Sequence, residues 1–366
     1  MKYYLISGEA SGDLHASNLV RELKQLDPAA EFRGFGGDLL AKEGMHLVRH
    51  YRDLAFMGFA EVILHLRTIL NNISFCKNDI REWKPDAVIL VDYPGFNLRV
   101  APFVKELGIK VFYYISPQVW AWKQSRVFRI REVVDRMFCI LPFEKDFYAK
   151  FDFEVDFVGH PLLDAIAREE NSEPALADDG RKIIALLPGS RGQEIKTMLP
   201  VMLSAASRFP EFRFVIAGAP SQPEKFYRGL MNGNSTEIVF GKTYALLRQS
   251  HAAIVTSGTA TLETALHAVP EVVCYRGSTV SYQIAKRLVK VDYISLVNLV
   301  MGKEVVKELI QSEMNAGTIS AELKKITADT NSRQKMLDDY AVLREKLGGP
   351  GASRRTAELI IKNLGA

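Results

Sequence analysis

The chain has 366 residues, of which 48% are hydrophobic and 25% are charged, the composition of an ordinary globular protein. Its net charge of +4 is too small to indicate nucleic acid binding by itself. No apolar run approaches the ~18 residues that a membrane-spanning helix needs. Two domains fit this length better than one, because single hydrophobic cores stop growing below this size.

The start of the chain and its cysteines are typical of a cytoplasmic protein. Met1-Lys2 run directly into a strand-like stretch, without the pattern of a signal peptide. Cys76, Cys139 and Cys274 are widely separated in apolar contexts, which favours buried thiols over disulfides or a metal site. We therefore expect a cytoplasmic protein with no bound metal and no cofactor.

The N-terminal half alternates strand and helix patterns. Strands are predicted at 3–7, 31–35, 86–92, 110–115, 136–140 and 155–158, and helices at about 14–26, 59–82, 97–107 and 143–150. A crossover between parallel strands needs a dozen or more residues, so strands separated by helices indicate a parallel sheet. The polar stretch 168–180, broken by Pro174 and Gly180, marks a domain boundary.

The C-terminal half repeats this alternation. Strands are predicted at 182–187, 212–217, 236–240, 252–256 and 271–275, followed by a helical pattern at about 319–364. Residues 348–351 (Gly-Gly-Pro-Gly) form a hinge before the last helix. We expect domains at 1–167 and 181–347, with a separate helix at 352–366.

Two glycine-containing loops, half a chain apart, each follow a buried-strand pattern and open into a helical one. They are residues 7–13 (Ser-Gly-Glu-Ala-Ser-Gly-Asp) and 188–194 (Pro-Gly-Ser-Arg-Gly-Gln-Glu). Strand, glycine loop and helix in this order start a Rossmann-like half. The pair predicts an α/β protein with two doubly wound, Rossmann-like domains facing a ligand cleft.

The first loop carries two acids, Glu9 and Asp13. Acids at this position suit sugar hydroxyls or proton transfer better than a phosphate, which a negative charge repels. The structural alternative is that Asp13 complements the helix dipole and Glu9 is a solvated turn residue. The spacing alone does not separate the two interpretations.

Asp92 ends the apolar run of the predicted strand at 86–92. Ligands of open α/β sheets bind outside the carboxyl ends of strands, and an acid delivered there is costly unless it is used or paired. Asp92 is therefore a candidate catalytic residue. The alternative is that it caps the following turn or helix.

The second domain has the pattern of a diphosphate site. Ser190 and Arg191 stand at one predicted helix start, and Gly258 and Thr259 stand at another, shortly before Glu263. Free N–H groups at helix N-termini bind anions, and Arg191 adds a fixed charge. Helix capping by the threonines, with Glu263 on the helix surface, is the alternative.

Three further stretches suggest contact with lipid or a phosphorylated ligand. Residues 54–70 are more apolar than one buried helix face requires and begin with Phe56, Met57 and Phe59, although core packing explains them equally well. Residues 117–136 mix aromatic and basic residues, as membrane interfaces, nucleic acid sites and cleft walls do. Residues 276–308 carry an excess of basic residues, which fits a phosphorylated ligand or an anionic membrane surface. The alternative is that they form a solvated helix face.

A series of motifs, in order along nearly the whole chain, resembles the lipid-A-disaccharide synthases, a family of bacterial glycosyltransferases. The series begins with the loop at 7–13 and ends with 293–299, and between them lie 56–62, 92–97, 116–122, 141–144, 158–161, 187–191, 256–263 and 285–290. One departure is Gly95, where some relatives have a second acid. The departure favours Asp92 as the shared base, with Asp13 and Glu9 still candidates.

The resemblance implies a GT-B fold, with the acceptor on the N-terminal domain and the UDP-sugar on the C-terminal one. It implies transfer of 2,3-diacylglucosamine from UDP-2,3-diacylglucosamine to lipid X (2,3-diacylglucosamine 1-phosphate), giving a β-1,6-linked disaccharide 1-phosphate and UDP. The last helix of such folds often packs back on the N-terminal domain. The hinge at 348–351 also allows exchange between subunits, which is compatible with a homodimer.

The donor sugar is α-linked to UDP and the product linkage is β, so the resemblance also implies inversion in one displacement. The candidate residues then take the following roles. Asp92 would be the base, with Asp13 orienting or assisting it. Arg191, with the backbone around Ser190, Gly258 and Thr259, would stabilise the diphosphate without a metal ion. Glu263 would bind the ribose, with Arg276 and Asn298 nearby, and Phe56, Met57 and Phe59 would receive acyl chains at the cytoplasmic face of the inner membrane.

Two other functions fit the same sequence less well. A UDP-N-acetylglucosamine 2-epimerase has the same fold and would convert a water-soluble UDP-sugar without an acyl pocket. A non-catalytic UDP-sugar-binding protein would bind UDP without turnover. Neither involves nucleic acid.

Overall fold

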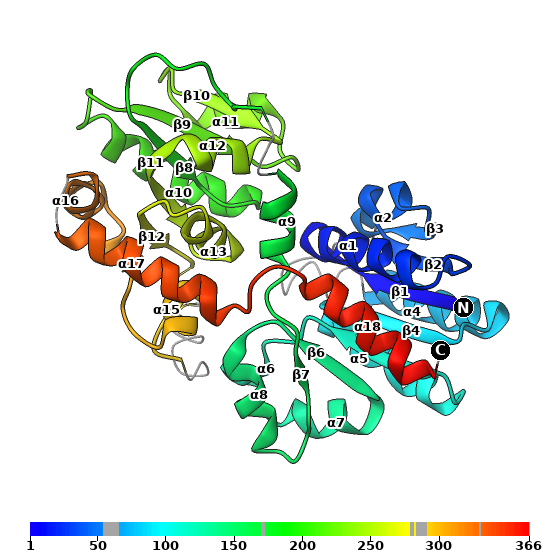
Figure 1. Ribbon diagram of the computed structural model, residues 1–366. Helices are drawn as coiled ribbons and strands as arrows, with labels where there is room; N and C mark the ends of the chain where they lie inside the picture. Colours follow the sequence, from blue (N-terminus) through cyan, green and yellow to red (C-terminus); the bar gives the residue numbers. More distant parts are fainter. Residues whose placement is uncertain (54–65, 170–172, 279–281, 283–290, 329–330, 366) are drawn as a thin grey trace. The chain divides into compact units, whose positions relative to one another are not determined.

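The computed structural model describes residues 1–53, 66–169, 173–278, 282, 291–328 and 331–365 (Figure 1). The chain forms two compact units. Unit 1 comprises residues 1–164 and 347–366, and unit 2 comprises residues 165–346. Within the described ranges, no helix is both long enough and apolar enough to cross a membrane.

Unit 1 is built on a seven-stranded parallel sheet in the order β3-β2-β1-β4-β5-β6-β7. Strand β4 is apolar and fully buried, and β1 and β5 are buried except at their first residues, as expected of a parallel sheet covered on both faces. The strands are β1 (Lys2–Ser7), β2 (Glu31–Gly36), β3 (His46–His50), β4 (Ala87–Val91), β5 (Lys110–Tyr114), β6 (Arg136–Cys139) and β7 (Asp156–Phe157).

Helices connect these strands, and the last helix of the chain returns to this unit. They are α1 (Ala10–Leu26), α2 (Asp38–Lys42), the 3-10 turn η1 (Tyr51–Asp53), α4 (Leu66–Trp83), α5 (Pro94–Glu106), α6 (Val119–Trp122), α7 (Arg126–Val133), α8 (Pro142–Ala149) and α18 (Ala352–Leu364). Helix α9 (Leu162–Glu169) begins in unit 1 and continues into unit 2.

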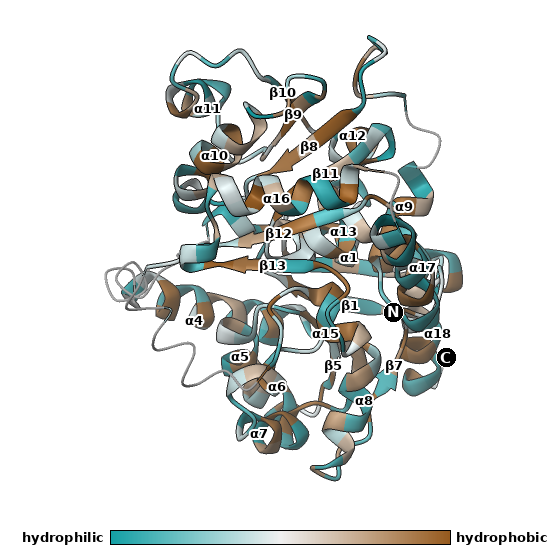
Figure 2. Ribbon diagram, turned by 90° about the vertical axis from the view of Figure 1, so that its left-hand side faces the viewer, coloured by the Kyte–Doolittle hydropathy of each residue, from teal (hydrophilic) through white to brown (hydrophobic). Residues whose placement is uncertain are grey.

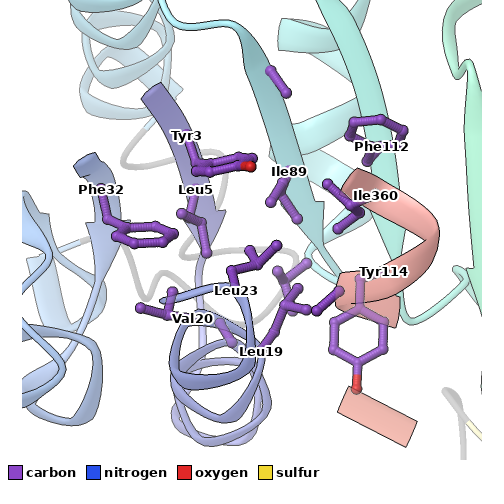
Figure 3. Packing of buried hydrophobic residues seen from close by; sticks show 14 of the residues in the cluster. Tyr3, Leu5, Leu19, Val20, Leu23, Phe32, Ile89, Phe112, Tyr114 and Ile360 are labelled. Carbon is purple, nitrogen blue, oxygen red and sulfur yellow. The ribbon is translucent and has the colours of Figure 1, made fainter. Parts of the chain in front are cut away.

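Helix α18 packs beside α1 and completes the core of unit 1 (Figure 1). Ile360 of α18 lies among Leu19 of α1 and Ile89 and Phe112 of the sheet (Figure 3). The carboxylate of Asp164 holds the start of α18, because it accepts hydrogen bonds from the main-chain N–H groups of Gly351 and Ser353. The chain thus leaves unit 1 after Asp164, and Asp164 also binds the start of α18, where the chain has returned to unit 1.

Unit 2 is built on a six-stranded parallel sheet in the order β10-β9-β8-β11-β12-β13. Its strands are β8 (Ile183–Leu187), β9 (Arg213–Gly218), β10 (Glu237–Phe240), β11 (Ser250–Thr256), β12 (Glu271–Tyr275) and β13 (Lys307–Ile310). Strand β8 is apolar and buried along its whole length (Figure 2). Besides α9, the helical elements are α10 (Gly192–Ala206), α11 (Glu224–Leu230), α12 (Thr243–Gln249), α13 (Thr259–Leu266), α15 (Leu296–Met301), η2 (Gln311–Glu313), α16 (Ala316–Thr327) and α17 (Asn331–Lys346).

The expectation of two Rossmann-like, parallel α/β domains is confirmed by these two sheets. Strands β3 and β13 were not predicted. Each lies at the edge of its sheet and carries charged or polar residues, as edge strands commonly do, so neither shows an apolar run. The predicted helix at 59–82 corresponds to α4 from Leu66 onward, and its first residues lie outside the described ranges.

Candidate functional site

Each sheet has one point where the strand order reverses, and most of the predicted residues follow the strands at these two points. In unit 1 the point lies between β1 and β4, which are paired through Ser7 and Val91. In unit 2 it lies between β8 and β11. Ligands of doubly wound sheets bind outside the carboxyl ends of strands at such points.

The main chain of Asp92 and Tyr93 is held in a strained conformation at the end of β4. Both residues are left-handed, with φ of 45° and 48°, which costs roughly 1–3 kcal/mol each for residues other than glycine. Asn97 and Tyr113 compensate, because the Asn97 Nδ2 and the Tyr113 hydroxyl each donate a hydrogen bond of 2.6 Å to the Asp92 carbonyl oxygen. Asn97 is fully buried, so this clamp is rigid.

The carboxyl group of Asp92 is suited to proton transfer near neutral pH. Burial, and then the negative charge of Glu9, raise the pKa of this carboxyl to about 7, although the Tyr93 main-chain N–H opposes the rise. The two loops approach closely, because the Tyr93 ring lies only 2.4 Å from where a Cβ on Gly8 would stand. A side chain at position 8 would therefore displace Tyr93 and the Asp92 loop with it.

Asp13 is buried and bound to the main chain rather than open to a ligand. Its carboxylate accepts hydrogen bonds from the N–H groups of Gly37 (2.7 Å), Leu39 (3.0 Å) and Leu40 (3.2 Å). These are groups at the start of α2, so Asp13 caps α2 from α1. It positions the loop after β2 at the same edge of the sheet as Asp92.

In unit 2, Ser190 and Arg191 follow β8 and lead into α10. Both are exposed, and the Arg191 side chain retains 57% of its accessible surface. Its guanidinium lies 3.3 Å from Glu194 in the first turn of α10, a surface ion pair worth little. Arg191 can therefore turn to an anion at small cost.

Gly258 and Thr259 follow β11 and start α13. Gly258 has φ of 156° and ψ of −161°, a conformation essentially restricted to glycine. The loop is fixed from behind, since the Ser257 N–H donates to the Cys274 carbonyl and the Ser257 hydroxyl donates to the Ile294 carbonyl, both at 2.9 Å. Gly258 and Thr259 are exposed, so the start of α13 presents main-chain N–H groups at the carboxyl edge of the sheet.

Glu263 lies one turn into α13 and is partly buried. The Tyr244 hydroxyl of α12 donates a hydrogen bond of 3.2 Å to its carboxylate. Burial raises the pKa of Glu263 to about 6; the Tyr244 hydrogen bond opposes the rise and the charge of Glu169 adds to it. Glu263 is therefore charged at neutral pH and can accept hydrogen bonds from hydroxyl groups.

Asn298 and Arg276 are engaged inside unit 2. The buried Asn298 amide binds the main chain at Val305 and Val306 and donates to Glu308. The Arg276 guanidinium donates to the main-chain carbonyls of Gln311 and Met314. Both side chains brace loops rather than point to a ligand.

The Glu308 carboxylate extends this bracing to the Gly258 loop. It accepts hydrogen bonds from the N–H groups of Ile294 (3.0 Å) and Ser295 (2.9 Å) and from the Asn298 amide (2.9 Å). Because Ile294 in turn binds Ser257, Asn298 supports the start of α13 through two intermediate residues.

Comparison with known proteins shows the family of this chain. Residues 3–362 match the family model described as lipid-A-disaccharide synthetase. The chain belongs to the lipid-A-disaccharide synthetase family. It is 40% identical over 371 residues to the lipid-A-disaccharide synthase of Geobacter metallireducens, covering 99% of this chain and 97% of that protein. It is 41% identical over 368 residues to that of Syntrophus aciditrophicus, covering 98% of this chain and 96% of that protein.

Solved structures related to this synthetase family member share its fold at low sequence identity. The UDP-GlcNAc 2-epimerase of Neisseria meningitidis bound to UDP-GlcNAc superimposes with a TM-score of 0.72 at 15% identity, covering 99% of this chain and 100% of that one. The glycotransferase of kitacinnamycin gives 0.67 at 14% identity, covering 99% and 98%. At these identities the likeness establishes a GT-B type fold, and the family match makes the chain a glycosyltransferase.

Several residues at these edges were not predicted from the sequence. Tyr113, Tyr244 and Glu308 act through partners that lie in other elements, which no local motif reveals. Asn97 binds Asp92 within the motif at 92–97, but the motif alone does not show that its amide holds the Asp92 carbonyl. Phe56, Met57 and Phe59, the predicted acyl-binding residues, lie outside the described residues.

Proposed function

We propose that this chain transfers 2,3-diacylglucosamine from UDP-2,3-diacylglucosamine to the 6-hydroxyl of lipid X, with inversion at the transferred sugar. The observation that carries the proposal is the family match over residues 3–362. The products are a β-1,6-linked disaccharide 1-phosphate and UDP. The charge and hydrogen bonding at the two sheet edges suit the two halves of this reaction.

Asp92 is the proposed base. In a single displacement the acceptor oxygen forms a bond to C1 of the donor sugar, the bond from C1 to the UDP oxygen breaks, and the hydroxyl proton passes to Asp92. A carboxylate with a pKa near 7 holds that proton far better than an ordinary one, and general base catalysis is typically worth ~10²–10⁴ in rate. Glu9 tunes this pKa, and Asp13 positions the neighbouring loop.

Unit 2 is the proposed donor-binding unit. Arg191, the Ser190 backbone and the N–H groups at Gly258 and Thr259 stabilise the charge that develops on the leaving diphosphate. Glu263 accepts hydrogen bonds from the ribose hydroxyls. Arg276 and Asn298 contribute by holding the loops described above.

The lipid part of the proposal places acyl chains at Phe56, Met57 and Phe59 and the protein at the cytoplasmic face of the inner membrane. A homodimer with exchanged C-terminal elements is compatible with the hinge at 348–351. The double variant Phe56→Ser, Phe59→Ser is expected to partition less to detergent micelles than the wild type, with an unchanged Tm. Unchanged partitioning would contradict this assignment.

The experiment that tests the proposal incubates the purified protein in non-ionic detergent with both lipids and follows UDP and disaccharide by mass spectrometry. Disaccharide is expected only when both substrates are present, and activity is expected to survive EDTA. Conversion of UDP-GlcNAc alone would favour the epimerase, and UDP binding without any product would favour a binding protein.

A further inference from the structure

In the part of unit 1 that the structure describes, two basic side chains between the end of α6 and the start of α7 have no acidic partner. Trp122 ends α6 with 49% of its surface exposed. The Lys123 Nζ lies 4.8 Å and the Arg126 guanidinium carbon 5.4 Å from the centre of its ring. Among the described residues, neither head group has a hydrogen bond to an acceptor or an ion pair to a carboxylate.

The neighbouring bases differ in this respect. Arg129 forms an ion pair with Glu132 at 3.0 Å, Arg131 donates to the Phe151 carbonyl at 2.7 Å, and Arg136 forms an ion pair with Asp156 at 2.7 Å. Two like charges on one ring instead repel each other, and an anion relieves that repulsion.

The local fold holds this pair in place. A turn closed by the hydrogen bond from the Arg126 N–H to the Lys123 carbonyl (3.0 Å) brings both side chains to the Trp122 ring. The preceding helix α6 is anchored from α8, because the Trp120 Nε1 donates to the buried Glu144 carboxylate at 3.2 Å. The two cations are therefore pre-organised by cation–π contact and by a fixed loop.

The pair lies at the same edge of the sheet as Asp92. Strands β4 and β5 are parallel neighbours, and the Asp92 N–H donates to the Tyr114 carbonyl at 3.0 Å. Tyr113 connects the two regions, since its hydroxyl binds the Asp92 carbonyl at 2.6 Å. Burial raises the pKa of Tyr113, and the Arg126 guanidinium is close enough to oppose that rise.

We infer that Lys123 and Arg126, on the ring of Trp122, form a phosphomonoester subsite that binds the 1-phosphate of the acceptor. The inference rests on the proposed function, in which the acceptor carries its phosphate on C1 and its reacting hydroxyl on C6, next to C5, so that the two groups extend from the two carbons that flank the ring oxygen of one sugar. A base at Asp92 therefore requires an anion-binding group within the width of one sugar, at the same edge. Arg126 supplies a planar fork for phosphate oxygens and Lys123 a compact second charge.

The test compares the double variant Lys123→Met, Arg126→Gln with a matched control, Arg129→Gln, Arg131→Gln, which removes the same charge from partnered bases. Both are assayed in non-ionic micelles with lipid X and with its dephosphorylated form, 2,3-diacylglucosamine. The subsite variant is expected to raise KM for lipid X about tenfold to a hundredfold, the range of lost charge-assisted hydrogen bonds. Its kcat and its Kd for UDP stay unchanged, and the control matches the wild type.

With the dephosphorylated acceptor, wild type and subsite variant are expected to have the same kcat/KM. An equal loss with both acceptors, or a weaker affinity for UDP, would overturn the subsite. A loss that appears only on vesicles containing anionic phospholipid, and not in non-ionic micelles, would assign the cations to the membrane surface and also overturn it.

Equilibrium binding of lipid X separates the subsite from the proposed reaction. If the wild type binds lipid X through these cations but forms no disaccharide, the proposed function fails and the subsite stands. If disaccharide forms and the subsite variant binds lipid X as well as the wild type does, the function stands and the subsite fails.

Discussion

The carboxyl edges of the two sheets share one topology and differ in chemistry. In unit 1 the main chain after β4 is strained and clamped by side chains, and it carries a carboxyl group whose pKa is raised to about 7. In unit 2 the loops after β8 and β11 leave Ser190, Arg191, Gly258 and Thr259 exposed at the starts of two helices. The same fold thus yields an edge suited to proton transfer and an edge suited to anion binding, depending on which groups its loops engage.

This comparison also separates functional acids from structural ones. Asp92, Glu263 and Asp13 all lie at the carboxyl edges, but the Asp13 carboxylate already accepts hydrogen bonds from three main-chain N–H groups. Glu271 begins β12, at the opposite edge, and is buried without a hydrogen bond to its carboxyl among the described residues. We propose that a carboxyl group at this edge is functional where main-chain N–H groups do not occupy it.

The largest expected effect is that of Asp92→Asn. If unit 1 supplies the base, kcat falls by ~10²–10⁴ because the amide does not accept the proton. The Kd for UDP, measured by calorimetry, stays at the wild-type value because unit 2 is untouched. Asp146→Asn, at an exposed position of α8, is the control and keeps full activity. A kcat near the wild-type value in Asp92→Asn would exclude Asp92 as the catalytic base.

Arg191→Ala is expected to weaken UDP binding about tenfold to a hundredfold, because it removes a charge-assisted hydrogen bond to the diphosphate. Calorimetric titration with UDP measures the effect. Arg181→Ala, which removes an exposed arginine paired with Asp179, is the matched control in the same unit. Equal affinity in both variants would mean that the edge after β8 does not bind the diphosphate.

The variant Tyr244→Phe tests the proposed role of the Glu263 carboxylate through the pH dependence of the affinity for UDP. The Tyr244 hydroxyl stabilises the charged form of Glu263, whose pKa is about 6, so its removal raises that pKa further. The affinity for UDP falls as Glu263 is protonated, so the fall begins at a higher pH in the variant than in the wild type. Superimposable affinity profiles between pH 5 and 8 would exclude Glu263 from the ribose site.

The smallest expected effect is that of Glu271→Gln, on stability alone. Burial raises the pKa of Glu271 well above its ordinary value, so the folded state keeps a proton that the unfolded state releases. The free energy of unfolding therefore falls as pH rises above the unfolded-state pKa. The amide of the variant does not titrate, so its Tm at pH 8 is expected to exceed that of the wild type by a few degrees, with little difference at pH 5 and none in kcat. A lower Tm than the wild type at pH 8 would contradict this account.

The sequence predicted what depends on local pattern. Strand–loop–helix alternation predicted both sheets, and an acid at the end of an apolar strand predicted the location of Asp92. The sequence did not predict the contacts of side chains whose partners are distant in sequence. Asp13 binds groups 24 to 27 residues away, and Arg276 binds carbonyls 35 and 38 residues away, so no spacing rule shows that these residues are already engaged.

The motif at 116–122 and the bases that follow it show a second limit of the sequence. Its aromatic residues and the following bases suggested several kinds of partner without distinguishing them. The structure distinguishes the bases by their contacts, since Lys123 and Arg126 share the Trp122 ring while Arg129 and Arg136 are paired with acids.

The most direct test of the central claim is the pH dependence of kcat/KM in the wild type and in Glu9→Gln. Asp92 must be deprotonated to act, so the wild-type rate is expected to fall on the acid side with a pKa of about 7. Glu9 raises that pKa by its negative charge, so Glu9→Gln is expected to move the acid limb to lower pH. An acid limb at the ordinary carboxyl pKa in the wild type, or an identical limb in the variant, would contradict a base at Asp92 tuned by Glu9.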